Sequence, residues 1–435
     1  MSSTPDVIAT HLHFSDLEGR PVVTPEGERV GTVADAIVKL LGAQPELSGL
    51  LLSLEGRDTF LHLDSIDSLA AAPLRLTGPS PDMKPFERRP GEVLLERDVH
   101  GRGVIDVEGA RLVQVDDVVF EPDGDTWRVA SIIARPVQTV GVFLGRILGR
   151  KTAPGEEIPW SRVEPLVGHV PTAGLRPRFG RLSELRPADI ADIVEEASRE
   201  EAEQILEAVH ADPELEADVF EELEDEERVE FLEARSDHEA AKVLAAMDPD
   251  HAADVLLDLD QDRRKPILEA LPPEQKSKVQ ALLSYGEETA GGLMNNEFIA
   301  LPPETTVQQA LQVIRERAEQ PQVLTVVYSL DSDGHLEGAI TLPQLLRQAP
   351  VARLADVVED DPVAVYPDAD LPSVAVQMAD YNLSALPVVD ENHGLLGVIT
   401  YDDLIHAIIP DEWRWRGRAE RAVEPDEEEE PGRPS

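Results

Sequence analysis

The chain has 435 residues, a formal net charge of -47 from 86 acidic and 39 basic residues, and no cysteine. Its length suffices for about three domains, and the lack of cysteine excludes disulfides, thiolate zinc sites and cysteine nucleophiles. The acidic balance argues against a nucleic-acid partner, because phosphate backbones are bound by clustered Lys and Arg. It fits either a well-solvated surface or a response to divalent cations, which prefer carboxylate oxygens.

Apolar runs in the sequence are too short for membrane helices. A spanning helix needs about 20 mostly apolar residues, whereas the clearest run, 140–145, ends at Arg146. The N-terminal sequence MSSTPD also lacks the basic and apolar regions of a signal peptide. We therefore predict a cytoplasmic protein with no membrane span. The segment 139–148 is predicted as an insertion packed on its own domain, with an interfacial helix as the alternative.

Two stretches near the N-terminus align without a gap at an offset of 82 residues, as from Asp16 to Asp98. The matched residues of the first stretch are Asp16, Gly19, Arg20, Val22, Gly27, Arg29, Val33 and Asp35, and those of the second are Asp98, Gly101, Arg102, Val104, Gly109, Arg111, Val115 and Asp117. Each copy reads as a strand, a glycine-containing turn and a second strand with alternating apolar residues. The sequence thus predicts two small barrel-like β modules, 1–90 and 91–168.

This turn-and-strand pattern, with Ile158, Pro159 and Trp160 near the end of the second copy, resembles the PRC-barrel family. The resemblance implies modules for binding and assembly. The chain contains no Gly-x-x-x-x-Gly-Lys-Ser/Thr loop, His-Glu-x-x-His pair or Gly-x-Ser-x-Gly elbow. We therefore predict that the protein is not an enzyme.

The composition changes after the second β module. A stretch rich in Pro, Gly and Arg marks a linker at 169–181, and from Leu182 the apolar residues recur at helical spacing. Short helices are predicted to begin at Pro187, Pro249 and Pro273, because proline suits the first helical position and acids such as Asp248 can cap the free amides. The segment 182–285 is therefore predicted as an α-superhelix of helices about ten residues long, with a charged outer surface.

A third internal repeat follows. Residues 336–346 align with 395–405, and each copy reads as an extended segment, a helix, two strands joined by a polar turn, and a closing helix. This pattern resembles a pair of CBS modules, at 286–352 and 353–410, which implies a homodimer formed through the pair. The segment 411–435 reads as an acidic tail, in which Trp413 and Trp415 either anchor a partner or cover the CBS surface.

The segment that joins the helices to the repeat reads Glu288-Thr-Ala-Gly-Gly-Leu-Met294. It resembles the linker Glu-x-Ala-Gly-x-Leu-Met of the MgtE family of magnesium channels and transporters, in which a helical N domain leads into a CBS pair. The resemblance covers about residues 180–410 and implies a response to Mg²⁺. The predicted fold class is a multidomain α+β protein with tandem small β-barrel-like modules, an α-superhelical domain and a CBS pair.

The CBS resemblance also implies a site for ATP or another adenine nucleotide in the cleft between the modules. There a Thr or Ser and an Asp three residues later contact the ribose. The second copy has Thr400 and Asp403 at these positions, whereas the first has Thr341 and Gln344 and so lacks the carboxylate. The alternative interpretation of Thr400 is a helix cap, because Thr-x-x-Asp resembles a capping box.

For Mg²⁺, the MgtE resemblance implies acidic residues at the interfaces of the second CBS module, and Asp370 and Asp403 match that pattern. Mg²⁺ keeps several waters, so one or two carboxylates from each domain suffice. In the helical domain Asp250, Asp254 and Asp258 are spaced to share one face of a helix. They are candidate ligands, with a solvated stripe as the alternative.

We therefore predict a non-catalytic regulatory protein that senses Mg²⁺ through acidic interfaces between its helical domain and its CBS pair. A separate membrane transporter is the partner considered for its output. The alternatives are an adaptor that responds to adenine nucleotides and a scaffold that binds no small ligand.

Overall fold

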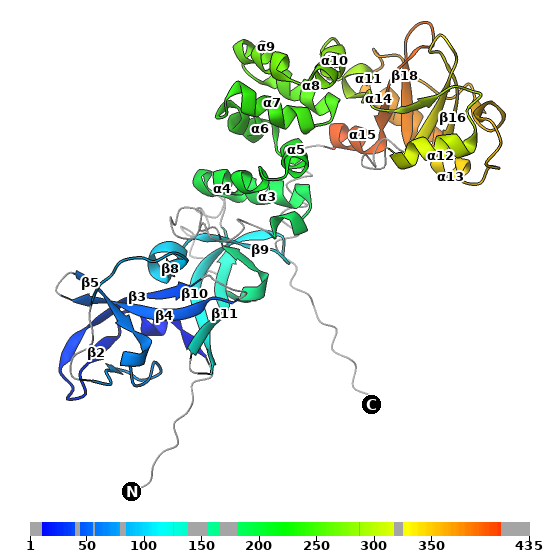
Figure 1. The fold of residues 1–435 in the computed structure, drawn as a ribbon. Helices are drawn as coiled ribbons and strands as arrows, with labels where there is room; N and C mark the ends of the chain where they lie inside the picture. Colours follow the sequence, from blue (N-terminus) through cyan, green and yellow to red (C-terminus); the bar gives the residue numbers. More distant parts are fainter. Residues whose placement is uncertain are drawn as a thin grey trace, which may run out of the picture. The chain divides into compact units, whose positions relative to one another are not determined.

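The computed structural model describes residues 11–39, 44–54, 57–78, 84–124, 126–137, 155–165, 181–286, 288–316 and 325–409. The chain divides into two compact units, Met1–Leu223 and Glu224–Ser435, and each is described by itself (Figure 1). The apolar segment 139–148, the predicted linker up to residue 180, and the predicted tail with Trp413 and Trp415 lie outside the described residues.

The first unit contains a sheet that joins 13 strands of the described residues. We call it the β body. Its strands are β1 (Leu12–His13), β2 (Pro21–Val23), β3 (Arg29–Lys39), β4 (Glu46–Leu54), β5 (Arg57–His62), β6 (Leu74–Arg75), β7 (Lys84–Pro85), β8 (Glu92–Leu94), β9 (Gly103–Asp106), β10 (Arg111–Asp123), β11 (Thr126–Pro136), β12 (Glu156–Pro159) and β13 (Val163–Pro165). One apolar core runs from Leu12 to Val163 and draws on both sequence repeats.

The two repeats exchange their first strands. Strand β1 of the first repeat pairs with β10 of the second, with Leu12 opposite Phe120. Strand β8 of the second repeat pairs with β3 of the first, with Leu94 opposite Ile37. Because each repeat completes the other's sheet and both share one core, the described residues of the repeats form a single body.

Two aspartates at equivalent repeat positions stabilise this strand exchange through hydrogen bonds to the other repeat. Asp35 Oδ1 accepts a hydrogen bond from the Glu96 amide at 2.8 Å, at the start of the helical turn Leu95–Val99. Asp117 Oδ1 accepts one from the Ser15 amide at 3.0 Å, at the start of α1 (Phe14–Leu17). Each carboxylate thus caps a helical turn of the other repeat, and backbone amides at a helix start are stabilised by such an acceptor.

Asp35 gives the β body a specific pH dependence. Its side chain is fully buried, and burial raises its pKa to about 6, against an opposing effect of the hydrogen bond from Glu96. The folded state therefore holds the proton more tightly than the unfolded state, so stability falls as pH rises from about 4 to 6. Asp35→Asn is expected to remove about 3 kcal/mol of this pH dependence.

Hydrogen exchange of the β3 and β8 amides across pH 4 to 8 measures this effect. Asp123→Asn is the control, because the Asp123 side chain is 59% exposed. Equal pH profiles for the wild type and Asp35→Asn would show that Asp35 is not the titrating group.

Short helices follow the β body, as predicted. They are α3 (Pro187–Glu196), α4 (Arg199–Val209), α5 (Pro213–Glu222), α6 (Asp225–Glu233), α7 (Asp237–Ala246), α8 (Pro249–Asp258), α9 (Gln261–Ala270) and α10 (Pro273–Leu282). The predicted starts at Pro187, Pro249 and Pro273 are confirmed. The predicted cap at Asp248 is wrong, since its side chain makes no capping hydrogen bond.

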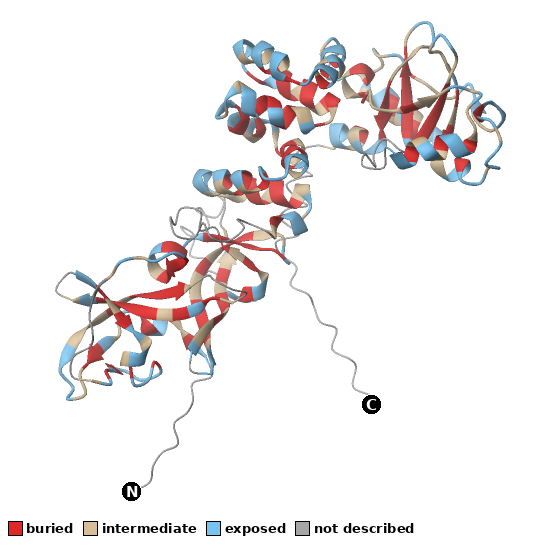
Figure 2. Ribbon diagram, in the orientation of Figure 1, coloured by how far each residue is buried: buried red, intermediate tan, exposed pale blue. Residues whose placement is uncertain are grey.

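Helices α3–α5 belong to the first unit and α6–α10 to the second. In the first unit, Glu201 of α4 accepts a hydrogen bond from the Gly103 amide of β9 at 3.0 Å. In the second, α7 packs on α9 and α8 packs on α10. Their inner faces are buried and their outer faces exposed (Figure 2), which is the amphipathic arrangement expected of stacked helices.

The predicted CBS pair is confirmed in the second unit. The first module contains β14 (Ile299–Leu301), α12 (Val307–Glu316), β15 (Val326–Leu330), β16 (Leu336–Thr341), α13 (Leu342–Leu345) and β17 (Glu359–Asp360). The second contains α14 (Leu371–Tyr381), β18 (Ala385–Val389), β19 (Leu395–Thr400) and α15 (Tyr401–Ile408). The modules share a small core in which Val326 and Tyr328 of the first meet Ala385 and Val398 of the second.

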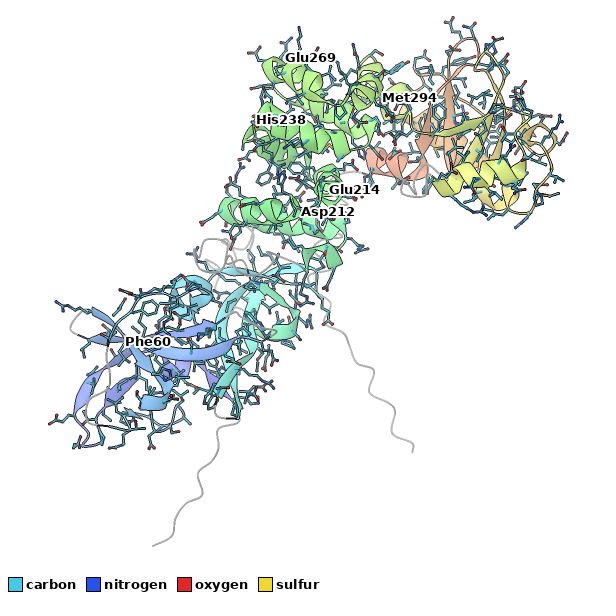
Figure 3. The ribbon with its side chains drawn as sticks, viewed as in Figure 1. Phe60, Asp212, Glu214, His238, Glu269 and Met294 are labelled. Atoms are coloured by element: carbon cyan, nitrogen blue, oxygen red, sulfur yellow. The ribbon has the colours of Figure 1, made fainter. Side chains whose placement is uncertain are left out.

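The segment between the helices and the first CBS module is fastened to the second module. We call residues 289–295 the strap; it includes α11 (Ala290–Leu293). The amides of Ala290 and Gly291 donate to the carbonyls of Ala369 and Pro367, at 2.8 and 2.9 Å. Asn295 and Val398 exchange two backbone hydrogen bonds of 2.8 Å each. Met294 lies at this seam (Figure 3), so the strap is an added edge of the second module.

Candidate metal centre

The first acidic group of the site comes from the start of α8. Pro249 occupies the first helical position, which places Asp250 in the first turn, where amide dipoles favour a carboxylate. Its side chain is only 4% exposed. Asn295 of the strap donates a hydrogen bond from Nδ2 to Asp250 Oδ1 at 3.2 Å.

The amide of Asn295 has a fixed orientation. Its Oδ1 accepts the backbone N–H of Glu297 at 2.7 Å, and its backbone is paired with Val398. The NH₂ group must therefore face Asp250. The strap thus connects Asp250 of α8, a candidate metal ligand, to β19 of the second CBS module.

The second acidic group comes from the start of α15. Thr400 caps this helix by accepting the Asp403 amide at 3.4 Å, and its hydroxyl donates to Asp403 Oδ2 at 2.5 Å. This reciprocal contact holds the Asp403 carboxylate against the first turn of the helix. One oxygen of Asp403 is thereby engaged, as one oxygen of Asp250 is engaged by Asn295.

Asp250, His251 and Asp403 converge within the second unit. Each offers a ligand atom, and these atoms all lie within 4.8 Å of one another. Asp250 is buried and the other two are half-buried. The cluster joins α8 of the helical array to α15 of the second CBS module, and it combines two carboxylates with one imidazole.

The surroundings of this cluster disfavour the ionisation of both carboxyl groups. Burial raises the pKa of Asp250 to about 7; His251 works against this shift, and the carboxylates of Asp403 and Asp248 add to it. Burial also raises the pKa of Asp403, while the hydrogen bond from Thr400 works against the shift. Two neighbouring carboxylates with little access to water are both charged only when a cation compensates them, and otherwise one of them takes up a proton.

The structure brings together two of the five predicted metal ligands, Asp250 and Asp403. Asp254 is half-buried on α8 and Asp258 is exposed, with its Oδ2 3.7 Å from Arg228 Nη2. The three aspartates of α8 therefore do not form one solvated stripe. Asp370 is exposed and caps α14 by accepting the Ser373 amide at 3.0 Å.

Sequence reasoning missed His251 and Asn295. The signal for His251 was its position directly after Asp250 at the start of a helix, since imidazole and carboxylate are both metal ligands. Asn295 carries no such signal, because only the folded strap places its amide against α8.

Two of the three predicted nucleotide residues, Thr341 and Thr400, cap helices. Thr341 and Gln344 form a capping box at α13, and Thr400 caps α15. Thr400 is buried, and its hydroxyl is bonded to Asp403. For Thr400, a helix cap was the alternative interpretation of the sequence.

Family models match the second half of the chain. The model of the MgtE intracellular N domain matches residues 185–288, and the CBS domain model matches 290–350 and 354–410. A crystal structure of the cytosolic domain of the Mg²⁺ channel MgtE in complex with ATP is 30% identical, with a TM-score of 0.50, over 92% of that chain and 52% of this one. The chain belongs to the MgtE family. The helical array and CBS pair thus correspond to an MgtE cytosolic region.

Other relatives agree with this placement. The soluble part of a magnesium transporter is 29% identical with a TM-score of 0.50, over 91% of that chain and 54% of this one. The magnesium transporters MgtE of Thermus thermophilus and Enterococcus faecalis are 36% and 33% identical over 31% of this chain. The match spans only 30% of each of these transporters. Among the described residues, no helix combines the length and apolar character required to cross a membrane.

Proposed function

We propose that this MgtE-type chain is a non-catalytic cytoplasmic regulator that senses Mg²⁺ at the interface between its helical array and its second CBS module. The observation that carries the proposal is the convergence of Asp250 and Asp403 from α8 and α15. In the absence of a cation the two carboxylates repel each other, because they are like charges close together and burial limits their contact with water. A bound cation reverses that repulsion and favours the closed interface.

The output of this sensor would pass to a partner. The similar proteins from Thermus thermophilus and Enterococcus faecalis are magnesium transporters, so we propose a membrane transporter as the partner. A conformational change can regulate such a partner only if the ion binds the closed and open states with different affinity. A site built from two domains meets this condition, because only the closed state assembles it.

We also propose that the CBS pair forms a homodimer. Large apolar side chains are exposed on its two neighbouring helices: Val376 and Tyr381 on α14, and Tyr401 and Ile408 on α15. Exposed large apolar side chains on adjacent helices suggest an interaction surface. The mass obtained from scattering measurements reports whether two copies assemble.

A nucleotide-responsive adaptor is the second candidate function. It is favoured by the similar MgtE cytosolic domain that was solved with ATP, and by the retained Thr400 and Asp403. The PRC-barrel-like assignment of 1–90 and 91–168 stays a prediction, with assembly as the role it suggests. A scaffold without any small ligand is the remaining alternative.

Small-angle scattering of the full chain during Mg²⁺ titration tests the proposal. A saturable compaction is expected beyond that caused by K⁺ at equal ionic strength, since a chain with charge -47 also contracts through screening. Asp250→Asn and Asp403→Asn are each expected to remove most of the Mg²⁺ effect, because they abolish the charge repulsion and weaken the ion ligand. Asp254→Asn, one turn further along α8, is the matched control.

Three results would contradict the proposal in different ways. Compaction by ATP and not by Mg²⁺ would favour the nucleotide adaptor. No response to either ligand would favour the scaffold. An Mg²⁺ response that Asp254→Asn removes as fully as Asp250→Asn would show that the ion acts elsewhere on α8.

A further inference from the structure

The imidazole of His251 changes the kind of cation that the cluster suits. We propose that the Asp250–His251–Asp403 cluster binds a first-row transition dication, of which Mn²⁺ is the probe, in preference to Mg²⁺. This inference rests on the proposed function, because it concerns the same interface. It adds a preference among dications that the donor set imposes, with Mg²⁺ as the weaker ligand of the same site.

The composition of the cluster favours a transition dication over Mg²⁺. Mg²⁺ takes oxygen ligands in octahedral geometry, so an imidazole nitrogen contributes little to its binding. Transition dications accept imidazole and carboxylate together. Among the described residues, the cluster of Asp250, His251 and Asp403 is the one that joins two different domains, and one of its three donors is nitrogen.

The geometry of the cluster is close to that of a metal site. The three ligand atoms lie within 4.8 Å of one another. Two ligands at about 2.1 Å from a common ion are about 3 to 4 Å apart. A small contraction of the interface would therefore allow all three ligand atoms to bind one ion. This contraction would bring α8 and α15 closer together.

Protein donors hold both carboxylates of the cluster in a defined orientation. Asn295 donates to Oδ1 of Asp250, and Thr400 donates to Oδ2 of Asp403. Each carboxylate thus has one oxygen held by a protein donor, which leaves the second oxygen to the ion. Donors that hold metal ligands in this way orient them and raise metal affinity.

Mn²⁺ binding to the full chain tests the inference by electron paramagnetic resonance. The signal of free Mn²⁺ falls as the ion binds, and nitrogen coupling in the pulsed spectrum reports an imidazole ligand directly. We expect Mn²⁺ to bind at least about 10-fold more tightly than Mg²⁺, measured by competition. His251→Gln is expected to abolish the nitrogen coupling and to weaken Mn²⁺ by about 10-fold or more, with less than about 3-fold change for Mg²⁺.

The matched control is His238→Gln, because His238 is an exposed histidine on α7 of the same unit (Figure 3). It is expected to leave both affinities unchanged. Saturable Mg²⁺ binding without a preference for Mn²⁺, or nitrogen coupling that survives in His251→Gln, would overturn the inference and leave the sensor in place. No saturable binding of either ion would overturn the sensor itself.

Discussion

Gly397→Ala is expected to destabilise the second unit by about 1 to 3 kcal/mol, because it inserts a methyl group into a seam with no room for it. A Cβ on Gly397 would lie 2.9 Å from the Asn295 carbonyl oxygen and 2.9 Å from Met294 Sδ. The Asn295 carbonyl cannot retreat without breaking its 2.8 Å hydrogen bond with the Val398 amide. The strap is therefore expected to loosen from β19.

Gly397→Ala is also expected to affect the metal centre. Once the strap shifts, the Asn295 amide no longer faces Asp250, and the cation response should weaken although no ligand was changed. Hydrogen exchange of the Asn295 and Val398 amides reports the strap, and thermal unfolding reports the stability.

Gly286→Ala is the control for this prediction, since a Cβ there would meet only Thr289 Cγ2 at 3.6 Å, an ordinary contact. If Gly397→Ala leaves the exchange of both amides unchanged, the strap does not depend on close packing at β19.

Asp106→Ala is expected to destabilise the β body by about 3 kcal/mol. Asp106 is fully buried at the end of β9 and accepts hydrogen bonds from Arg162 at 3.0 and 3.1 Å and from Arg111 at 3.3 Å. Removing the partner of a buried charge costs about 3 to 5 kcal/mol. The Arg162 and Arg111 side chains are 30% and 27% exposed, so their charged groups partly recover hydration, and the lower end of that range applies.

The effect should extend to the helices of the same unit, because β9 also carries the Gly103 amide that binds Glu201 of α4. Urea unfolding together with hydrogen exchange of β9 and β13 measures both consequences. Asp123→Ala is the control: its ion pair with Arg128 is 3.6 Å long and exposed, and such pairs contribute less than about 1 kcal/mol. Equal destabilisation by Asp106→Ala and Asp123→Ala would show that the buried ion pairs of Asp106 contribute no more stability than an exposed pair.

The order and type of the elements were readable from local patterns. Proline at the first helical position predicted the starts of α3, α8 and α10, because the steric and hydrogen-bonding reasons act within one turn. The CBS repeat was readable for the same reason: its strands, polar turns and closing helices each have a local signature.

The arrangement of the N-terminal repeats was not readable. An offset of 82 residues shows that two copies exist, as from Asp35 to Asp117, but the same pattern is compatible with separate or intertwined copies. Pairing of β1 with β10 and of β8 with β3 depends on contacts about 100 and 55 residues apart along the chain, which no local preference encodes.

The sequence by itself determined the acidic character, the absence of thiol chemistry, the helical array, the CBS pair and the relation to MgtE, because each of these follows from composition or from motifs a few residues long. Only the tertiary structure selected Asp250 and Asp403 from five candidate aspartates, and only it added His251 and Asn295 to them. The physical reason is that a metal centre is a property of atoms close in space, and here those atoms come from α8, the strap and α15, which the chain brings together only on folding.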